Sequence, residues 1–559
     1  MSIKEHLTKI YDEAIADAYI DDYEAIIYSV KNKGGRQKKA LDEKDVVLIT
    51  YADQFYEPDE KNIQTFRRFA EKYLKGIFEI IHFLPFYPYS SDDGFSVIDY
   101  LQVKKEIGDW QDFERMSQDF DLMYDFVCNH ISSKSAWFEE FLEGNPDYSA
   151  YFIESKQSED LSLVTRPRTT TLLTRFETAD SYKDIWTTFG PDQIDLNYGH
   201  PKVLLKMLEI FLIYTQKGAS WIRLDAVGYI WKEIGTNCIH HPKAHEIVKL
   251  FRTALDQTSS GFKIITETNV PHADNISYFG NGKDESHMVY QFPLPPLVLY
   301  SFLNQDATRI SKWAKSVTLP SEETSFFNFL ASHDGVGINP IRGIIPEEEI
   351  VALVDRLQKE AGALVSYKDN ANGTKSPYEI NVSYFSAIKC QSSDDEAITK
   401  FINAQSILLG LMGVPAIYIH SLLGSQNYTE GILQTKQNRT INRQKYPLQS
   451  FLEVLNDPAS VNYKVYNKLT ELIKIRRQIT AFSPSAHQEI LELDDRVFAF
   501  LRISETKERV MCLHNFSDER ITLHHEDFYR FHDLLDDNKE IVTDGTIDLL
   551  PYMFKWISI

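Results

Sequence analysis

Cysteine is scarce in this sequence, and its few copies are not paired. Cys128, Cys238, Cys390 and Cys512 are widely separated, and no CxxC motif is present. This spacing argues against a disulfide framework and against a thiolate metal site. The sequence therefore predicts buried free thiols in a protein of a reducing compartment.

Excess positive charge and long apolar runs are missing as well. The 559 residues include 59 Lys and Arg against 81 Asp and Glu, a formal net charge of −22. Such a chain lacks the basic face that nucleic acids and anionic membranes require. No apolar run approaches a membrane span, and the N-terminal residues lack the apolar segment of a signal peptide. We expect a soluble cytoplasmic protein, in which an anionic substrate needs a local basic pocket.

A glycine-rich phosphate turn after an early strand is also absent, which argues against an open doubly wound sheet. The chain instead contains short apolar, β-rich runs that alternate with segments of helical period. Such an alternation predicts a parallel (β/α)8 TIM barrel of the α/β class. In chain order the runs are DVVLITY, FEIIHFLPF, DLMYDFVCNH, ASWIRLDAV, FKIITETN, HMVYQF, FFNFLASHD and VPAIYIHSLLG.

The chain is too long for one core, and the segments after the third and seventh runs are too long for ordinary loops. The first of these segments has little regular period, and the second reads as a helix plus a loop. The last segment alternates in strand fashion, which predicts a small antiparallel domain. The expected units are an N-terminal helical extension (1–44), the catalytic barrel (45–130 and 201–482), an inserted subdomain (131–200), a second insertion (335–382) and a C-terminal β domain (483–559).

Polar residues collect at the ends of four of these runs. In a TIM barrel the C-terminal strand ends form the active site, so polar residues gathered there indicate catalysis. Any one of them alone is better explained as a satisfied structural residue. Four runs that end alike make this explanation improbable for the whole set. The residues are Asn129 and His130, Arg223 and Asp225, Glu267, and His333 and Asp334.

The acids on the fourth and fifth runs suit one type of chemistry. Arg223 and Asp225 point to the same face because side chains alternate along a strand. Carboxyl groups that end neighbouring strands lie roughly 5 Å apart, which suits a retaining glycosidic mechanism. We expect Asp225 to be a nucleophile held ionised by Arg223, and Glu267 an acid and base with a raised pKa. A metal cluster is the rival use of these acids, but no HxxxH or DxD spacing supports it.

The strand ends DFVCNH, WIRLDAVGY, IITETNV and NFLASHDG resemble the four signature regions of glycoside hydrolase family 13, the α-amylase clan. The motifs occur in order and the resemblance covers nearly the whole chain. It implies a retaining mechanism in which Asp334 stabilises the transition state. The resemblance also implies roles on the glucosyl hydroxyls for Arg223, His130 and His333.

Within the clan, LITYADQF, LPFYPYSSDDGFSVIDY, RLDAVGYIWKEIGTNC, FPLPPLVLY and TINRQKYP resemble the sucrose phosphorylase subgroup. This resemblance implies a transferase that uses inorganic phosphate as co-substrate and needs no cofactor. It further implies that Asp92 and Arg443 clamp the far hydroxyls of glucose, with Phe95 and Tyr229 as apolar walls. Arg168 and Tyr378 fit the loops that present phosphate, and arginine suits a pair of phosphate oxygens.

One position departs from sucrose phosphorylases, which usually carry a histidine two residues after the acid and base. Here Asn269 stands there, and TETNVPH looks more like the glucosylglycerate phosphorylase branch. A glycerate leaving group is an anion, so its binding needs a cation or several donors. The candidates are Asn269, Lys375 and Arg342, together with Arg175 and Lys232.

The alternatives are a sucrose, sucrose 6'-phosphate or glucosylglycerol phosphorylase, a hydrolase of the same fold, and a non-catalytic carbohydrate-binding barrel. The intact set of acids argues against the last. Although Asn129 aligns with a calcium ligand of many amylases, we predict no metal. The partners expected are small molecules alone, and a homodimer is left open.

Overall fold

The computed structural model describes residues 1–30, 40–156, 158–258, 261–369 and 374–559. Residues 31–39 of the expected helical extension lie outside this description, as do residue 157 of the first expected insertion and residues 370–373 of the second. The boundaries of the expected units stay predictions. Within the described residues, no helix is both long enough and apolar enough to pass through a bilayer.

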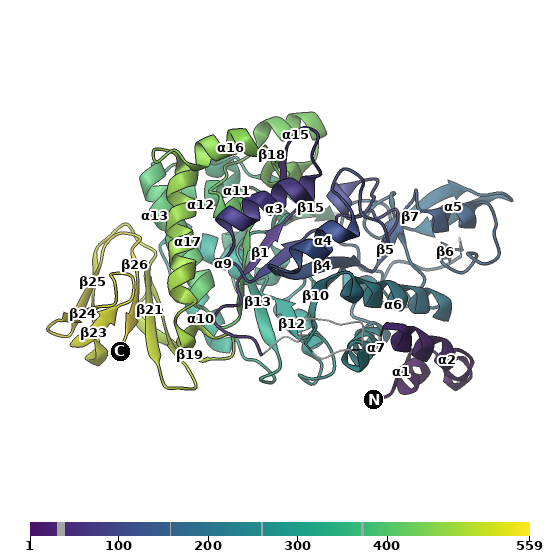
Figure 1. Ribbon diagram of the computed structural model, residues 1–559, viewed down its shortest axis with the longest axis horizontal. Helices are drawn as coiled ribbons and strands as arrows, with labels where there is room; N and C mark the ends of the chain where they lie inside the picture. The colour runs from purple at the N-terminus through teal and green to yellow at the C-terminus, as the bar shows by residue number, and fades with distance from the viewer. Residues whose placement is uncertain (31–39, 157, 259–260, 370–373) are drawn as a thin grey trace.

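Strands from all eight apolar runs close into a parallel barrel, so the predicted fold is confirmed (Figure 1). The closed order in the described chain is β1-β17-β13-β12-β11-β10-β4-β3. Most of these strand residues are buried, which explains why the runs lack the polar alternation of a half-exposed strand. The strands are β1 (Val47–Thr50), β3 (Ile80–Phe83), β4 (Asp121–Val127), β10 (Ala219–Asp225), β11 (Lys263–Thr266), β12 (Met288–Tyr290), β13 (Ser325–Phe329) and β17 (Val414–Tyr418).

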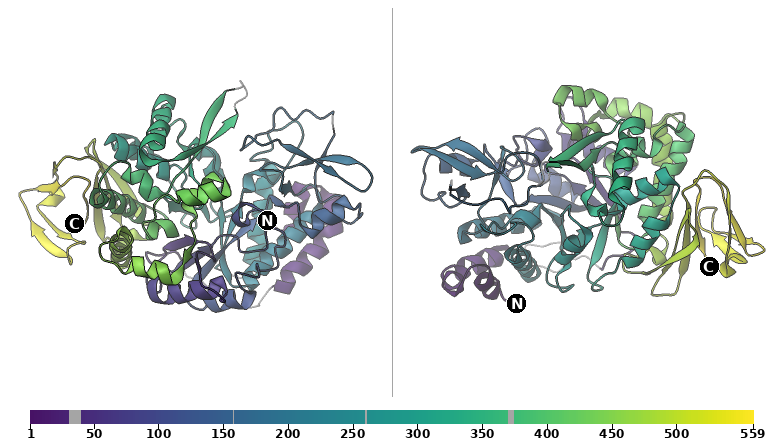
Figure 2. Two further views of the ribbon diagram at one scale, coloured as in Figure 1. Left: turned by 90° about the horizontal axis from the view of Figure 1, so that it is seen from above. Right: turned by 180° about the vertical axis from the view of Figure 1, so that it is seen from behind.

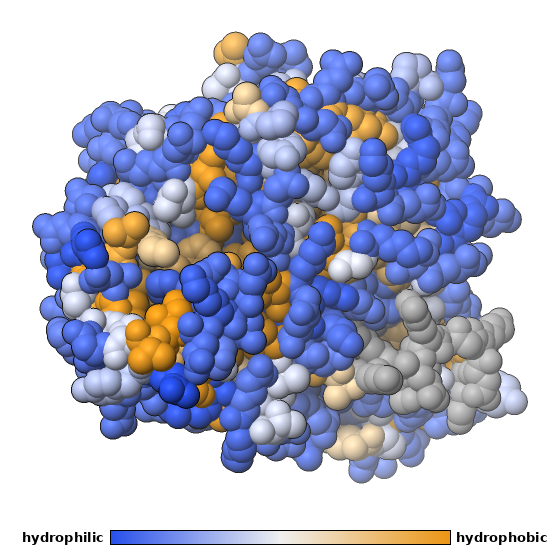
Figure 3. Space-filling view, turned by 60° about the vertical axis from the view of Figure 1, so that its left-hand side comes forward, coloured by the Kyte–Doolittle hydropathy of each residue, from blue (hydrophilic) through white to orange (hydrophobic). Residues whose placement is uncertain are grey.

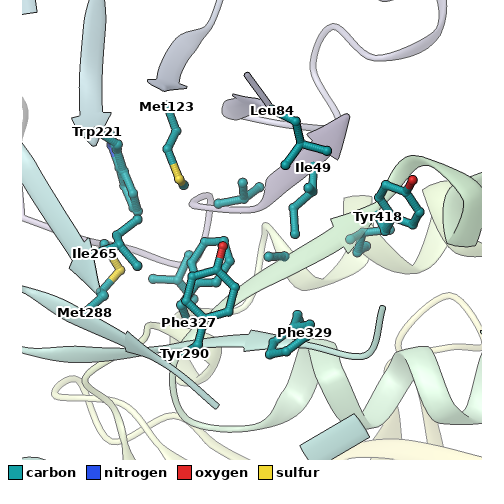
Figure 4. Packing of buried hydrophobic residues seen from close by; sticks show 14 of the residues in the cluster. Ile49, Leu84, Met123, Trp221, Ile265, Met288, Tyr290, Phe327, Phe329 and Tyr418 are labelled. Atoms are coloured by element: carbon teal, nitrogen blue, oxygen red, sulfur yellow. The ribbon is translucent and has the colours of Figure 1, made fainter. Parts of the chain in front are cut away.

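The inside of the barrel is a packed apolar core. Ile49, Met123, Trp221, Ile265 and Phe327 are buried and come from five different strands (Figure 4). Side chains of a barrel this size fill its interior, so no open channel runs through it. Among these apolar side chains, the barrel strands also hold a buried polar network of His82, Asp125 and Arg223.

Helices surround the barrel. Some bury one stripe of their surface, whereas the helix Leu294–Asn304 is buried along almost its whole length. In α3 the buried residues Ile63, Phe66, Phe69 and Ala70 recur at helical spacing. Two further helices, α1 (Ile3–Ile10) and α2 (Glu13–Val30), pack on α7 and α6 at the N-terminal end of the chain (Figure 1). The other helices between and after the barrel strands are α3 (Asn62–Tyr73), α4 (Trp110–Met116), α6 (Pro201–Gln216), α7 (Pro242–Thr258), α8 (His272–Ile276), α9 (Leu294–Asn304), α10 (Thr308–Ser316), α12 (Tyr384–Lys389), α13 (Asp394–Gly410), α14 (Ile419–Leu422), α15 (Thr429–Thr435), α16 (Leu448–Leu455) and α17 (Val461–Arg476).

The segment between β4 and β10 is more regular than its sequence suggests. It contains α5 (Ala136–Leu142) and a small antiparallel sheet in the order β6-β8-β7, together with a β5–β9 pair. The strands are too short, and too exposed on one side, to leave a clear period. They are β5 (His130–Ser132), β6 (Glu154–Ser155), β7 (Leu173–Glu177), β8 (Tyr182–Trp186) and β9 (Gln193–Asp195).

The segment after β13 contains the expected helix, α11 (Glu347–Ala361), and also an antiparallel hairpin that the sequence does not predict. The hairpin strands β15 (Leu364–Asp369) and β16 (Lys375–Asn381) form a sheet with β14 (Val336–Gly337). Seen from above, the hairpin and the first insertion rise on the same side of the barrel (Figure 2, left). Residues of both segments line one chamber there, which places two loops over the barrel mouth.

The C-terminal segment forms antiparallel sheets, as predicted. A sheet in the order β19-β20-β21-β26-β23-β24 packs beside α10 and α13, and β22 pairs with β25. The face of the molecule in Figure 3 is mostly hydrophilic, in keeping with the charge of the chain. The remaining strands are β2 (Phe55–Tyr56), β18 (Tyr446–Pro447), β19 (His487–Asp494), β20 (Val497–Ile503), β21 (Arg509–Asn515), β22 (Ile521–His524), β23 (Arg530–Asp533), β24 (Lys539–Val542), β25 (Thr546–Leu549) and β26 (Phe554–Ser558).

Candidate active site

A small cavity of about 70 Å³ lies at the C-terminal ends of the barrel strands. It brings together residues that are far apart in the chain, from the strand ends and from both insertions. Of the described residues that line it, five are acids (Asp92, Asp225, Glu267, Asp334 and Glu379) and two are arginines (Arg168 and Arg439). The predicted site residues among its walls are Asp92, Phe95, His130, Arg168, Asp225, Glu267, Asn269, His333, Asp334 and Tyr378.

Arg223 lies buried at the centre of the carboxyl groups. Its Nη1 donates to Asp225 Oδ1 at 2.8 Å, and its Nη2 lies 3.8 Å from Glu267 Oε2. The same guanidinium ion-pairs with Asp125, its direct partner in the β10–β4 register. Asp125 in turn accepts from His82 Nε2 at 2.8 Å. Sequence reasoning missed Asp125, although an acid inside a buried run was a visible signal.

The pKa of Asp225 is higher than expected for a carboxylate held ionised by Arg223. Burial, reinforced by the neighbouring Glu267 carboxyl, raises the pKa of Asp225 to about 8 despite Arg223. Burial also raises the pKa of Glu267, as predicted, and Arg223 only partly opposes this. The reason is that one guanidinium is shared among Asp125, Asp225 and Glu267. At neutral pH the Asp225–Glu267 pair therefore holds one proton between its two carboxyl groups.

The pKa of Asp334 is shifted in the opposite direction because two arginines lie beside its carboxyl group. Arg439 Nη1 lies 2.6 Å from Asp334 Oδ1, and Arg443 Nη2 lies 3.8 Å from the same oxygen. Although burial opposes ionisation, Arg439, His333 and Arg443 hold the pKa of Asp334 well below its usual range. Arg439 also donates to Glu379 from Nε at 3.1 Å and from Nη2 at 2.7 Å. Sequence reasoning missed Arg439, which stands four residues before Arg443.

A strained turn presents Asp92 to the cavity. Asp92 and Asp93 both have a left-handed φ, 53° and 49°. Gly94 follows at φ 111°, where a Cβ atom would lie 2.6 Å from the Pro85 carbonyl oxygen, so only glycine fits there. Arg443 Nη1 holds the turn at 3.0 Å from Asp93 Oδ2 and 3.6 Å from Asp92 Oδ1.

Asp192 anchors this turn to the first insertion. Its Oδ2 accepts from the hydroxyls of Ser90 and Ser91 at 2.5 Å and of Ser96 at 2.9 Å, and its Oδ1 accepts from Ser133 at 2.5 Å. Arg168 reaches the turn from the same insertion, with Nη2 3.4 Å from Asp92 Oδ2. The predicted phosphate and glucose residues therefore meet at one place.

Two neutral histidines and aromatic rings form another wall. Phe95 stacks on His333 with ring centroids 4.6 Å apart and planes at 4°. His130 Nε2 donates to the Phe95 carbonyl oxygen at 2.9 Å. Burial lowers the pKa of His130 to about 4 and the pKa of His333 to about 3, so both rings are uncharged at neutral pH. The wall can therefore pack on a sugar ring and hydrogen-bond its hydroxyls without adding charge.

Other predicted residues lie outside the cavity. Tyr229 and Arg342 line a larger adjoining chamber, and Arg443 lies behind Asp92. Lys375 is exposed at the start of β16 and does not line the cavity. Arg175 is an exposed residue of β7, with Nη2 2.8 Å from Asp184 Oδ2.

Lys232 is a buried ion-pair partner, with a side chain only 3% exposed. Its Nζ lies 2.9 Å from Asp195 Oδ2 and donates to Asn129 Oδ1 at 2.6 Å. The resemblance to amylases marks Asn129 as a calcium ligand. Here the Lys232 ammonium contacts Asn129 instead, so Asn129 does not fit a metal site. Across the described ranges, no group of three or more His, Cys, Asp and Glu residues is arranged to hold a metal ion.

Comparisons with known proteins identify relatives of this chain. Residues 49–350 match the family described as "Alpha amylase, catalytic domain". The chain is 47% identical to the glucosylglycerate phosphorylase of Escherichia coli strain K12, covering 100% of this chain and 99% of that protein. It is 48% identical to the glucosylglycerate phosphorylase of Spirochaeta thermophila, covering 89% of this chain and 85% of that protein. The solved sucrose 6F-phosphate phosphorylase of Thermoanaerobacter thermosaccharolyticum superposes with a TM-score of 0.75 at 25% identity, covering 93% of this chain and 99% of that one.

Proposed function

The chain belongs to the α-amylase family, and we propose that it is a retaining phosphorylase that cleaves glucosylglycerate with inorganic phosphate. The products would be α-glucose 1-phosphate and glycerate. The observation that carries this proposal is the full-length similarity to glucosylglycerate phosphorylases. The acids gathered at the barrel mouth support it, because a phosphorylase of this type needs an intact pair of catalytic carboxyls.

Asp225 and Glu267 divide the chemistry between them. Arg223 donates to Asp225 at 2.8 Å and stands 3.8 Å from Glu267, so the shared proton belongs on Glu267 and the charge on Asp225. An oxygen of Asp225 attacks the anomeric carbon while Glu267 gives its proton to the departing glycerate oxygen. The glycosidic bond breaks and a glucosyl ester of Asp225 forms.

Phosphate completes the reaction. A phosphate oxygen attacks the anomeric carbon, the ester bond to Asp225 breaks, and the Glu267 carboxylate accepts the proton of the phosphate. Two displacements restore the α configuration. Asp334, held ionised by Arg439 and Arg443, stabilises the positive charge that develops on the sugar ring.

The glucosyl unit fits the wall built by the predicted binding residues. Asp92 accepts hydroxyl hydrogen bonds, and Arg443 holds the strained turn that carries it. Phe95 packs on one face of the ring, and Tyr229, predicted as the second apolar wall, lines the adjoining chamber instead. His130, His333 and Arg223 supply further hydrogen bonds to the hydroxyls.

Arg168 and Tyr378 hold phosphate in this proposal. Arg168 lines the cavity and is ordered by its Nη1 bond to the Phe189 carbonyl oxygen at 3.2 Å. Its contact with Asp92 is long, 3.4 Å, so the second nitrogen can turn to a phosphate oxygen. Tyr378 lines the same cavity from the hairpin strand β16 and adds a neutral donor.

A substrate panel tests the proposal. Release of glucose 1-phosphate is measured with glucosylglycerate, glucosylglycerol, sucrose and sucrose 6'-phosphate, each with and without phosphate. We expect phosphate-dependent release, fastest from glucosylglycerate. A faster reaction with sucrose or its phosphate would contradict the substrate, and glucose release at the same rate without phosphate would contradict the phosphorylase.

A further inference from the structure

A second chamber, of about 700 Å³, opens beside the catalytic cavity. We call it the outer chamber. Asn269 and Tyr378 line both spaces, so these two side chains form the wall between them. Asn269 stands two residues after Glu267, which places this wall beside the proposed proton donor. A leaving group that takes a proton from Glu267 therefore faces the outer chamber.

The charge of the outer chamber is opposite to that of the catalytic cavity. Among the described residues that line it, Arg166, Arg342 and Lys368 are cations and Asp274 is the one carboxyl. In a protein with a net charge of −22, such a lining concentrates anions locally. The neighbouring histidine, His240, contributes no charge because burial lowers its pKa to about 4.

Arg342 and Lys368 lie close enough to repel each other. Burial, followed by the charge of Arg342, lowers the pKa of the Lys368 ammonium. Lys368 Nζ donates to Asn339 Oδ1 at 3.1 Å, a neutral acceptor that does not balance its charge. Arg342 pairs with Glu347 through Nη1 and donates from Nη2 to the Pro377 carbonyl oxygen at 3.3 Å.

Arg342 also has one hydrogen-bond donor without a partner. Its Nε atom is buried and has no hydrogen-bond partner among the atoms that the structure describes. An unpaired buried donor of a charged group is costly, and a bound anion would satisfy it. The pair therefore has the two properties of an oxyanion site: a surplus of positive charge and a donor without a partner.

We propose that Arg342 and Lys368 form the site that binds the carboxylate of the acceptor, a small hydroxy acid, in the outer chamber. This inference rests on the proposed function and specifies which residues read the acceptor. The chamber is far roomier than a three-carbon acid needs, so charge rather than shape selects the acceptor. Phosphate, in contrast, is assigned to Arg168 on the far side of Tyr378.

The test runs the reaction in the direction of synthesis, from glucose 1-phosphate and either D-glycerate or glycerol. We expect Arg342→Gln and Lys368→Met each to lower kcat/KM for glycerate roughly 10- to 100-fold more than kcat/KM for glycerol, as the loss of a charge-assisted bond does. Arg356→Gln is the matched control, since Arg356 is a partly exposed residue of α11 paired with Glu360. That variant should leave the ratio of the two acceptors unchanged. An equal loss for glycerate and glycerol would overturn the site.

A second arm separates carboxylate from phosphate. In phosphorolysis, Arg342→Gln should raise the KM for phosphate much less than it raises the KM for glycerate in synthesis. Equal increases would mean that the pair attracts any oxyanion, and would overturn the assignment to the acceptor.

A binding experiment separates this inference from the proposed function. D-glycerate, inorganic phosphate and glycerol are titrated into the wild type and Arg342→Gln by calorimetry, without turnover. If the wild type binds glycerate and the variant binds it more weakly, the site is supported even if glucosylglycerate is not cleaved. Cleavage of glucosylglycerate with unchanged glycerate binding in the variant would overturn the site and leave the function standing.

Discussion

The catalytic cavity and the outer chamber share a wall but are built differently. The lining of the cavity includes five carboxyl groups, several of them on barrel strand ends and held by Arg223 and Arg439. The outer chamber is lined by cations on loops and on the hairpin strand β15, and one of these cations keeps an unpaired donor. Chemistry that all members of a fold share needs the rigid strand ends, whereas acceptor recognition can change with the loops.

The two regions also differ in which like charges lie close together. In the cavity, a single guanidinium is shared by three acids, so a proton must remain on the Asp225–Glu267 pair. In the outer chamber, Arg342 and Lys368 lie near each other with only Glu347 as a paired carboxylate among the described residues, which leaves a surplus of positive charge. The first region thus retains a proton, and the second retains net positive charge.

The largest expected effect comes from removing the catalytic carboxyls. Glu267→Gln and Asp225→Ala should each lower kcat for glucose 1-phosphate release by 10³-fold or more, about 4 kcal/mol of barrier at about 1.36 kcal/mol per tenfold. Circular dichroism and melting temperature should stay near those of the wild type. Near-normal turnover in a folded variant would contradict the roles assigned to Asp225 and Glu267. It would also contradict the view that the cavity, rather than the outer chamber, carries out the chemistry.

A smaller effect is expected from Arg168→Ala. The variant should lose about 10- to 100-fold in kcat/KM for phosphate, because a charged donor to an anion is removed. Hydrolysis of the same glucoside in the absence of phosphate needs no such donor and should change little. The ratio of glucose 1-phosphate to glucose is the measurement. A parallel loss of both products would make Arg168 a residue of the fold, since it also orders Phe189 and Asp92.

The smallest expected effect concerns stability. Folding raises the pKa of Asp225 to about 8 and also raises the pKa of Glu267, so the folded pair holds one extra proton and wild-type stability falls as the pH rises through this range. Asp225→Asn removes that dependence. Its unfolding free energy relative to the wild type should therefore increase by about 2 kcal/mol from about pH 6 to pH 8, at about 1.36 kcal/mol per pH unit for one proton. Urea titrations at the two pH values measure it. A constant difference would show that the Asp225–Glu267 pair holds no extra proton in the folded state.

Much of the fold could be predicted because the signals are local. Each barrel strand is a short buried run, and its apolar residues are visible without knowledge of its neighbours. The β15–β16 hairpin was missed for the same reason, since its residues are partly exposed and its pairing is with each other rather than with the core. The small sheet after β4 was missed because strands of two to five residues are too short to show a period.

The sequence by itself determined the barrel strands and the acids at their ends, because alternation along a strand and the register of a parallel barrel place Asp225, Glu267 and Asp334 on one rim. Only the tertiary structure decided the electrostatic state of that rim. Arg439 reaches Asp334 across 105 residues of sequence, and Asp125 shares Arg223 from the neighbouring strand. Charges act through space, so the proton on the Asp225–Glu267 pair and the cation pair of Arg342 and Lys368 depend on distances that sequence spacing does not contain.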